Sequence, residues 1–520
     1  MNEQLQAAWA LLPDYLGQHV ILSASALVLG LAISVPLAIA AIRSPRVRWP
    51  VLAFASLIQT IPSLALLALF YPLLLALSAL TQRSAGVEFS ALGFLPSLLA
   101  LTLYSMLPII RNGVTGVLNL DPAILEAARG VGMTERQRLW RVELPLAIPM
   151  LMAGLRTATV WVVGAATLST PVGQTSLGNY IFSGLQLENW VSVLFGCAFA
   201  AALALVVDQL LGLIESGAAK RSRWRVAAGI GVLALGVGVA AASQLGGGRA
   251  AYVIGAKNFS EQYILADLLA ERLHEQHQAV AQRVGLGSVV AFRALANGEL
   301  DAYVDYTGTL WANVLKRTDT ASRSEVLAQT ARALERDYGV KLLGPLGFEN
   351  AYALAMRRTE AERLGIRTIA DLAKHAPSLS IGGDFEFFAR PEWAAMQAGY
   401  GLKFASQREF QSTFMYRAVA SGEVDVISAF SSDGRIAGED LVVLADPKQV
   451  VLPYDAVLLV APERAGDPVI QRAFEPLVDR IPIDAMRQAN MLVDRDEDKY
   501  TPEAAAEWLL NEIGLPARPQ

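Results

Sequence analysis

Cysteine and histidine are the scarcest chemistry-bearing residues of this 520-residue chain. The one cysteine, Cys197, lies in an apolar run, so neither a disulfide framework nor a cysteine-based metal site can form. The four histidines are scattered, and no nucleophile–histidine–acid set or paired metal motif accompanies them. No lysine follows a glycine, so the phosphate loop G-x-x-x-x-G-K-[ST] is absent as well. These absences argue against an enzyme and predict neither a cofactor nor a metal in this chain.

Charge is scarce in the first half of the chain. Residues 1–250 carry 15 Lys and Arg against 10 Asp and Glu, a net charge of +5. Subtraction from the whole-chain totals of 43 and 48 leaves 28 basic and 38 acidic residues in 251–520, a net charge of −10. This contrast indicates a membrane sequence followed by a soluble, acidic domain. An acidic soluble half argues against nucleic acid as a partner.

Apolar segments long enough to cross a bilayer, which takes about 20 residues, recur along the first half. The second segment is overlong and contains Pro62 and Pro72, which predicts a kink or a split into a span and a re-entrant piece. The six segments are 19–42, 51–80, 91–110, 146–169, 190–214 and 226–245.

Basic residues gather in alternate loops between these segments. Basic loops of membrane proteins remain in the cytoplasm, so six spans with an outside N-terminus place all three loops on that side. We therefore expect a multi-pass protein of the plasma (inner) membrane, with the acidic half on the extracytoplasmic side. The loop residues are Arg43, Arg46 and Arg48; Arg111, Arg129, Arg136, Arg138 and Arg141; and Lys220, Arg221, Arg223 and Arg225.

The charged stretch "EAARGVGMTERQRLWRVELP" interrupts the apolar half between the third and fourth segments. An amphipathic helix that rests on the membrane surface would explain such a stretch. The small side chains of Ala127 and Ala128 also allow a helix to approach another surface closely. We expect Glu126 to cap this helix at its N-terminal end, Gly132 to stop or bend it, and Pro145 to restart a helix at the membrane.

This stretch, residues 126–145, resembles the EAA loop of ATP-binding-cassette (ABC) importer permeases. The resemblance implies a short helix that enters a groove of a cytoplasmic ABC ATPase, so that ATP is used by the partner subunit. The stretches "LIQTIPSLALLALFYPLLLAL" and "LYSMLPIIRNGVTGVLNLDP" are similar to permeases for betaine-type osmoprotectants over most of residues 20–215. One permease domain per chain implies a homodimer bound to an ATPase dimer.

The sequence changes character at "GGGRA", residues 246–250, which predicts a flexible joint. Beyond it, short apolar strands alternate with amphipathic helices, and Ser260 with Glu261 is expected to open the first helix. The expected domains are a permease in 1–215, a basic loop, sixth span and linker in 216–250, and a substrate-binding domain in 251–520.

An internal repeat predicts the architecture of the second half. "RALANGELDAYVDYTG" at 293–308 aligns without gaps with "RAVASGEVDVISAFSS" at 417–432, at an offset of 124 residues. Each copy suggests a helix end, a glycine turn and a strand that ends in an aromatic residue, Tyr306 or Phe430. Chance similarity between helix–turn–strand units is the alternative. A true repeat predicts two α/β lobes whose strand ends face a shared cleft.

The expected first lobe comprises residues 251–348 and 435–520, and the second comprises 349–434. Two crossovers between the lobes would form a hinge that closes on a ligand. The motifs of this half, in order, resemble the choline/carnitine/glycine-betaine receptors of osmoprotectant importers over about 250–515. They are "GAKNFSEQ", "DAYVDYTGTLW", "FENAYALAM", "GGDFEFFARPEW", "AFSSDGRIA" and "LPYDAVLL".

The resemblance implies a small quaternary ammonium ligand, held by cation–π contacts of about 0.5–2 kcal/mol each. Tyr306 and Tyr352 would be walls of the cage, which Tyr416 and Phe430 would complete from the second lobe. The whole chain would then be an all-α, six-span transmembrane permease domain followed by an α/β, two-lobed (type II, clamshell) substrate-binding domain.

Polar residues of the same motifs complete the predicted ligand site. Gln262 and Thr309 would hydrogen-bond the polar end of the ligand, and Asn350 and Asp433 belong to the same set. Glu386 and Arg390 either meet the other charges of a zwitterion or form an inter-lobe or surface ion pair.

The sequence leaves the identity of the ligand undetermined. Phe430 replaces a tyrosine that is usual in these receptors, and Ala351 and Ser432 replace threonines. Ergothioneine, a trimethylated histidine betaine, is carried by a closely related family of fused permease–receptors and is the alternative ligand. A ligand-gated channel or sensory receptor is the alternative class, although such a protein would not need an EAA loop.

Overall fold

The computed structural model describes residues 2–85, 89–187, 189–246, 251–317, 319, 321–448, 450–495 and 497–515. The described chain divides into a helical unit, within residues 2–246, and an α/β unit, built mainly from residues 251–515. Of the predicted joint at 246–250, only Gly246 is among the described residues, as the last residue of a helix. Each unit is considered by itself.

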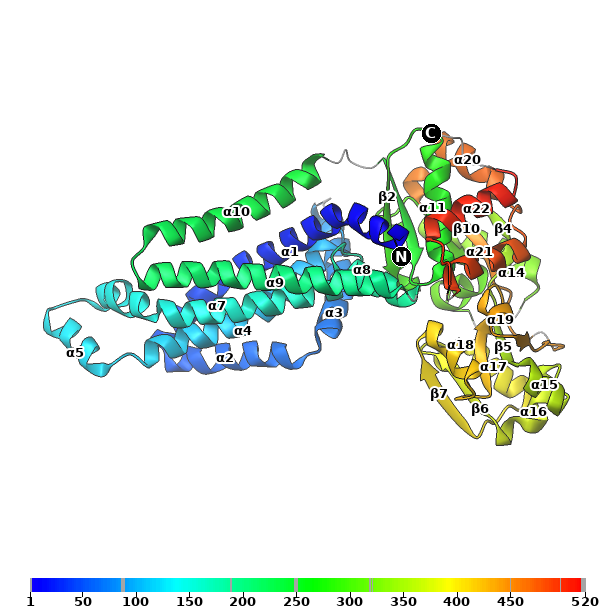
Figure 1. Ribbon diagram of the computed structural model, residues 1–520, viewed down its shortest axis with the longest axis horizontal. Helices are drawn as coiled ribbons and strands as arrows, with labels where there is room; N and C mark the ends of the chain where they lie inside the picture. Colours follow the sequence, from blue (N-terminus) through cyan, green and yellow to red (C-terminus); the bar gives the residue numbers. More distant parts are fainter. Residues whose placement is uncertain are drawn as a thin grey trace. The chain divides into compact units, whose positions relative to one another are not determined.

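Within the described residues, five helices are long and apolar enough to cross a membrane, or six if one bent pair counts as a single span. This count agrees with the six apolar segments predicted from the sequence. In Figure 1, α4, α7 and α9 lie side by side, and α1 packs against α4 and α7. The long helices are α1 (Asn2–Arg43), α4 (Phe94–Leu118), α7 (Leu144–Ala166), α9 (Trp190–Ala219) and α10 (Arg223–Gly246).

The bent pair consists of α2 (Pro45–Thr60) and α3 (Ser63–Ala85), which meet at 105°. Pro62 lies at the break and forces the preceding residue, Ile61, into an extended backbone conformation. The hydroxyl of Tyr104 donates a hydrogen bond to the carbonyl oxygen of Ile61, which satisfies a group freed by the break. The predicted split of this segment is therefore confirmed, whereas Pro72 lies inside α3 without ending it.

The charged stretch begins with a short helix, α5 (Pro122–Gly130). Its cap is Asp121, whose side chain accepts a hydrogen bond from the backbone N–H of Ala123 at 2.9 Å. The prediction that Glu126 caps the helix is therefore wrong, because the helix starts four residues earlier, at a proline suited to the first position. Gly132 ends the helix as predicted, with a φ of 77° that favours glycine.

A second helix starts before the membrane segment, at α6 (Glu135–Arg138). Thr134 and Gln137 form a capping box there, with hydrogen bonds of 2.9 and 3.3 Å. The helix continues through a π-helical segment, Leu139–Glu143, directly into α7. Pro145 therefore does not restart a helix, contrary to the prediction. The π-helical turn shifts the hydrogen-bond pattern by one residue immediately before this proline, which has no N–H to donate.

The α/β unit contains two five-stranded sheets with equivalent topology, in the orders β2-β1-β3-β10-β4 and β7-β6-β8-β5-β9. In each sheet four strands run in one direction, and one strand, β10 or β5, is antiparallel to both of its neighbours. The first sheet comprises β1 (Tyr252–Lys257), β2 (Val280–Leu286), β3 (Ala302–Tyr306), β4 (Lys341–Glu349) and β10 (Asp455–Val460). The second comprises β5 (Tyr352–Arg357), β6 (Ser380–Asp384), β7 (Ser406–Phe410), β8 (Val426–Phe430) and β9 (Leu441–Val443).

Helices pack around each sheet. The first sheet with its helices forms the first lobe, and the second sheet with its helices forms the second lobe. The predicted repeat is confirmed, because α12 and β3 recur as α18 and β8 at the same offset of 124 residues, each with a left-handed glycine between them. The helices of the unit are α11 (Ser260–His274), α12 (Ser288–Ala296), α13 (Thr307–Thr309), α14 (Arg323–Tyr338), α15 (Arg358–Leu364), α16 (Ile369–His375), α17 (Pro391–Tyr400), α18 (Ser412–Ala420), α19 (Arg435–Gly438), α20 (Pro468–Phe474), α21 (Ile483–Asp494) and α22 (Pro502–Glu512).

Two crossovers connect the lobes. The first lies between β4 and β5, and the second between β9 and β10. The structure places the second crossover later than residue 434, the predicted end of the second lobe, because β9 still pairs with β5 in the second sheet. The crossovers touch, since the backbone N–H of Asn350 donates to the carbonyl oxygen of Tyr454 at 3.0 Å.

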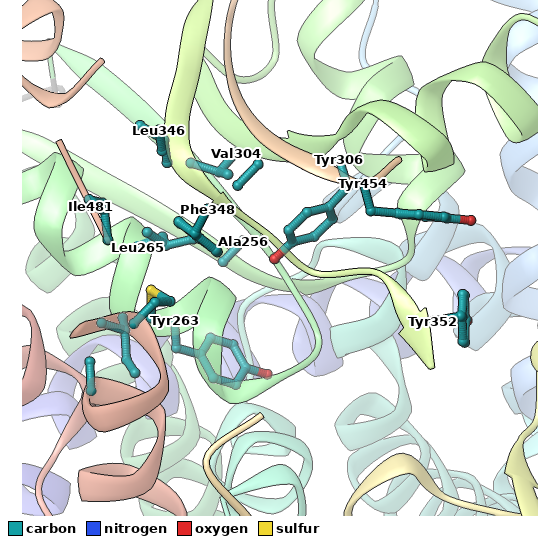
Figure 2. Close-up of a cluster of buried hydrophobic side chains, with 14 of the residues drawn as sticks. Ala256, Tyr263, Leu265, Val304, Tyr306, Leu346, Phe348, Tyr352, Tyr454 and Ile481 are labelled. Atoms are coloured by element: carbon teal, nitrogen blue, oxygen red, sulfur yellow. The ribbon is translucent and has the colours of Figure 1, made fainter. Parts of the chain in front are cut away.

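A cluster of buried hydrophobic side chains extends through the α/β unit. Figure 2 shows Tyr306, Tyr352 and Tyr454 at one side of this cluster, whereas Leu346 and Ile481 lie at the other. These tyrosines adjoin the strand ends and crossovers, so the core places aromatic rings where the two lobes meet.

An ion-pair triad connects two long helices of the helical unit. Arg156 of α7 forms two hydrogen bonds of 2.8 Å with the carboxylate of Asp208 in α9, and one of 3.0 Å with Glu215. Charged groups within a membrane span are costly unless they are paired. The triad therefore holds α7 against α9 only while both signs of charge are present.

Substitution Asp208→Asn is expected to lower the stability of the purified chain by about 2 kcal/mol, because the guanidinium of Arg156 loses its bidentate partner. The measurement is the thermal unfolding midpoint in detergent. The matched control is Asp440→Asn, whose ion pair with Arg358 is exposed and should matter by less than about 0.5 kcal/mol. Equal midpoints for the two variants would contradict a structural role for the triad.

A half-buried carboxyl group predicts a pH dependence in the α/β unit. Burial raises the pKa of Asp267 to about 7, and the hydrogen bond of 2.7 Å from Gln282 offsets part of this rise. The folded state therefore binds more protons than the unfolded state between about pH 4 and pH 7, so stability falls as pH rises through this window. Asp267→Asn should remove the fall and stabilise the chain at pH 8 by about 1–2 kcal/mol.

Thermal unfolding of the full chain at pH 4.5 and pH 8 measures this effect. Asp371→Asn is the control, since the hydrogen bond from Thr368 lowers the pKa of Asp371 to about 2; this carboxyl stays ionised at both pH values, so its replacement should leave the difference between the two midpoints unchanged. A variant at position 267 that keeps the original pH dependence would refute the assignment.

Candidate functional site

Glu261 is the centre of a buried hydrogen-bond network in the α/β unit. Its Oε1 atom accepts hydrogen bonds from the hydroxyl of Tyr306 at 2.5 Å and from Nδ2 of Asn350 at 3.1 Å. Its Oε2 atom accepts one from Nδ2 of Asn490 at 2.8 Å. Burial raises the pKa of Glu261, and these hydrogen bonds lower it in part. This buried carboxyl group of α11 thus depends on donors from three other chain segments.

These four segments meet at the crossovers. Glu261 lies in the first turn of α11, Tyr306 ends β3, Asn350 lies in the first crossover, and Asn490 lies in α21. Asn490 also donates to the carbonyl oxygen of Ser432, which follows β8 of the second lobe, at 2.9 Å. The network therefore links both lobes beside the hinge.

A small hollow adjoins this network. Its lining combines two phenyl rings with three carboxyl groups, one guanidinium group and several uncharged polar groups. Among the lining residues are Phe259, Ser260, Glu261, Asn350, Phe430, Ser432, Asp433, Arg435, Asn490 and Asp494.

Acidic groups outnumber basic groups in this hollow. Arg435 binds Asp433 in a bidentate manner, at 3.0 and 2.6 Å, and lies 3.8 Å from Asp494. Burial raises the pKa of Asp494 to about 6, although Arg435 lowers it in part, and Ser260 donates a hydrogen bond to it at 2.5 Å. The excess of carboxyl groups beside aromatic rings favours a cation over an anion.

The structure brings two of the predicted cage rings together. Tyr352 and Phe430 face each other across the pair β5–β8, with ring centroids 5.1 Å apart. Tyr416 lies behind Phe430, since its hydroxyl accepts a hydrogen bond of 3.0 Å from the backbone N–H of Phe430. Tyr306 is anchored separately, through its hydroxyl, to Glu261.

Three of the four predicted rings already carry a cation of the protein. The guanidinium of Arg435 lies 4.3 Å from the ring centroid of Tyr416, and that of Arg390 lies 5.0 Å from that of Tyr352. The ammonium of Lys257 lies 4.4 Å from the ring centroid of Tyr306 and 5.8 Å from that of Phe259. A ring that already faces a cation binds a second one less well, because the two positive charges repel each other.

The polar residues predicted to bind ligand are mostly occupied within the protein. Gln262 accepts a hydrogen bond from the backbone N–H of Lys257 at 3.2 Å and donates one to the Tyr306 hydroxyl at 3.1 Å. Thr309 is buried in the short helix α13. Asn350 lines the hollow, as does Asp433.

Arg390 forms ion pairs within the second lobe, with a buried guanidinium, rather than the inter-lobe or surface pair that was one of its two predicted roles. It lies 3.3 Å from both Glu386 and Glu392, and it donates a hydrogen bond of 2.8 Å to the hydroxyl of Tyr454. Glu386 itself is largely exposed, with 62% of its side chain accessible.

The sequence did not single out three residues that line the hollow. Arg435 lies within the recognised motif "AFSSDGRIA", which was the signal that could have identified it, whereas Asp494 and Asn490 lie in or next to a helix that contains no recognised motif. Ser260 and Glu261 were expected to open α11. The helix does begin at Ser260, but these two side chains contact Asp494 and the buried network instead of serving as the cap.

The chain contains a bundle of apolar helices, followed by a two-lobed α/β unit with an acidic, aromatic hollow. This combination defines a class of protein. It is an ABC-importer subunit that combines a permease with a substrate-binding domain. Residues 250–511 match the family described as substrate binding domain of ABC-type glycine betaine transport system. Residues 30–220 match the family described as binding-protein-dependent transport system inner membrane component. The chain belongs to the family of permeases fused to a glycine-betaine-type substrate-binding domain.

The chain is similar to two transport proteins and to one solved structure. The ergothioneine transport permease/ergothioneine binding protein EgtU of Helicobacter pylori (strain G27) is 30% identical over 483 residues, which are 89% of this chain and 83% of the relative. The glycine betaine/carnitine/choline transport system permease protein OpuCB of Bacillus subtilis (strain 168) is 40% identical over 199 residues, 38% of this chain and 84% of the relative. A solved glycine betaine/carnitine/choline ABC transporter structure is 27% identical, with a TM-score of 0.46, and covers 51% of this chain and 99% of its own.

Proposed function

We propose that this chain captures a quaternary ammonium compound in the hollow of its α/β unit and passes it through its membrane half. The observation that carries this proposal is the phenyl ring of Phe430, which lines the hollow beside an excess of carboxyl groups. A trimethylammonium group has no N–H donor and is weakly hydrated, so ring faces and diffuse negative charge suit it. The names of the relatives, which include glycine betaine, carnitine, choline and ergothioneine, agree with this ligand class.

The assembly follows from the same reasoning. Two copies of the chain would form the translocation pathway, with the binding domain on the extracytoplasmic side and a separate cytoplasmic ABC ATPase dimer that uses ATP. Residues 126–145 would contact this ATPase through α5, whose Glu126, Ala127 and Ala128 lie before a glycine-ended turn. The loop residues Val131 and Trp140 are exposed, as a docking segment requires.

Substitution of the paired rings tests the ligand site. Phe430→Ala should weaken binding of the preferred quaternary ammonium ligand about tenfold or more, because it removes an aromatic face that lines the hollow. Tyr352→Ala should weaken binding less, because the ring of Tyr352 packs on Phe430 but already faces Arg390. Isothermal titration of the full chain in lipid nanodiscs measures the affinity. The matched control is Phe404→Ala, a half-buried phenyl group before β7, at the opposite end of the second sheet. If both test variants bind like the control, the aromatic site is refuted.

Substitution of Gly132 tests the ATPase contact. Gly132→Val should abolish uptake, because a β-branched residue at a φ of 77° distorts the end of α5, while ligand binding stays unchanged. Gly130→Ala is the control, since Gly130 has open space around it and helical backbone. Uptake into proteoliposomes that contain the ATPase, measured beside ligand affinity, separates the two effects. Normal uptake by the valine variant would count against the proposed contact.

A further inference from the structure

Two amide side chains in the hollow are held in one orientation by Glu261. Nδ2 of Asn350 donates to Oε1 of Glu261, and Nδ2 of Asn490 donates both to Oε2 of Glu261 and to the carbonyl oxygen of Ser432. If the amide of Asn490 flipped, its oxygen would face two acceptors. The carboxyl group and the carbonyl therefore fix the direction in which each amide oxygen points.

Both amide oxygens lack a hydrogen-bond partner. Among the residues that the structure describes, Oδ1 of Asn350 and Oδ1 of Asn490 are buried and accept no hydrogen bond. Asn350 is 7% exposed and Asn490 is 3% exposed, and both line the hollow that contains Phe259 and Phe430. Buried acceptors without donors are costly and rare in folded proteins, so such a pair beside a hollow indicates a missing donor.

We propose that these two oxygens select the ligand, so that the substrates are quaternary ammonium compounds that also carry an O–H or N–H donor. This inference rests on the proposed function and narrows it. The amides cannot turn to present N–H groups to a ligand carboxylate, because Glu261 occupies those groups. The carboxyl groups of Asp433 and Asp494 repel the carboxylates of glycine betaine, carnitine and ergothioneine alike, so the hydrogen-bond donor is what distinguishes these ligands.

The proposal ranks ligands by whether they carry a hydrogen-bond donor in addition to the quaternary ammonium group. Choline and carnitine each carry a hydroxyl group, and ergothioneine carries N–H groups on its ring. Glycine betaine has a trimethylammonium group and a carboxylate but no donor at neutral pH. A site built to hydrogen-bond a donor strongly rejects an analogue that lacks it, because its own acceptors then stay unpaired.

The test is a titration of the full chain in lipid nanodiscs with two groups of ligands. Choline, carnitine and ergothioneine supply donors, whereas glycine betaine and n-propyltrimethylammonium do not. The last compound replaces the hydroxyl of choline by a methyl group and is its shape-matched control. We expect the tightest donor-bearing ligand to bind about tenfold or more tightly than either donor-free ligand. A donor-free ligand that binds as tightly as the best donor-bearing ligand would overturn the inference.

Variants connect this preference to the amides. Asn490→Leu should reduce the ratio of the two affinities to about threefold or less, by weakening only the donor-bearing ligand. A merely structural loss would weaken both ligands equally and leave the ratio unchanged, which would also overturn the inference. Asn511→Leu, on the exposed surface of α22, is the control for the substitution itself.

The ligand panel on the unmodified chain decides the matter even if the leucine variant fails to fold. Absence of binding by every compound would refute the proposed function, and the inference with it. Binding without a preference for donors would refute the inference alone.

Discussion

The polar groups that this chain removes from water must find partners inside it, and that requirement shapes the α/β unit. Glu261 has no solvent to receive its charge, so donors from β3, the first crossover and α21 converge on it. Because these segments come from distant parts of the sequence, a single carboxyl group links the end of β3, the first crossover and α21 to α11. The hollow lies beside this network, where, among the described residues, the amide oxygens of Asn350 and Asn490 receive no hydrogen bond.

The helical unit obeys the same requirement in a different way. Arg156 is neutralised by two carboxylates of α9, and the carbonyl oxygen of Ile61, freed at a sharp bend, receives the hydroxyl of Tyr104. In hydrocarbon no water can substitute for such partners. Irregular backbone and charge are thus tolerated only where a neighbouring helix supplies the complementary group.

Periodicity and spacing in the sequence predicted the architecture well. Apolar length predicted the long helices, proline predicted the bend at Pro62, and the repeat predicted equivalent units that end at Tyr306 and Phe430. These features depend on local sequence. The predicted helix cap was wrong. Asp121 and Glu126 are both acidic residues near the start of α5, and only the position at which the helix begins decides which of them is the cap.

The composition of the hollow was less predictable. Asn490 is an ordinary residue of an amphipathic helix, and its role depends on a contact with Glu261, which is 229 residues away in the chain. The cations over the predicted rings were equally hidden, since Lys257 and Arg435 gain their positions from folding rather than from neighbouring sequence. Motifs therefore indicated which segments form the site, whereas side-chain partnerships across segments decide what each residue does there.

The π-helical segment at Leu139–Glu143 has a consequence for the length of this part of the chain. Each residue of an α-helix advances the rotation by about 100°, so an inserted or deleted residue turns everything beyond it by that angle. The widened turn behaves as such an insertion. It sets which flank of α7 meets α4 and which meets α9. The identity of each residue in this segment is thus freer to vary than the number of residues. A one-residue deletion would rotate the whole of α7 relative to the helices that pack against it.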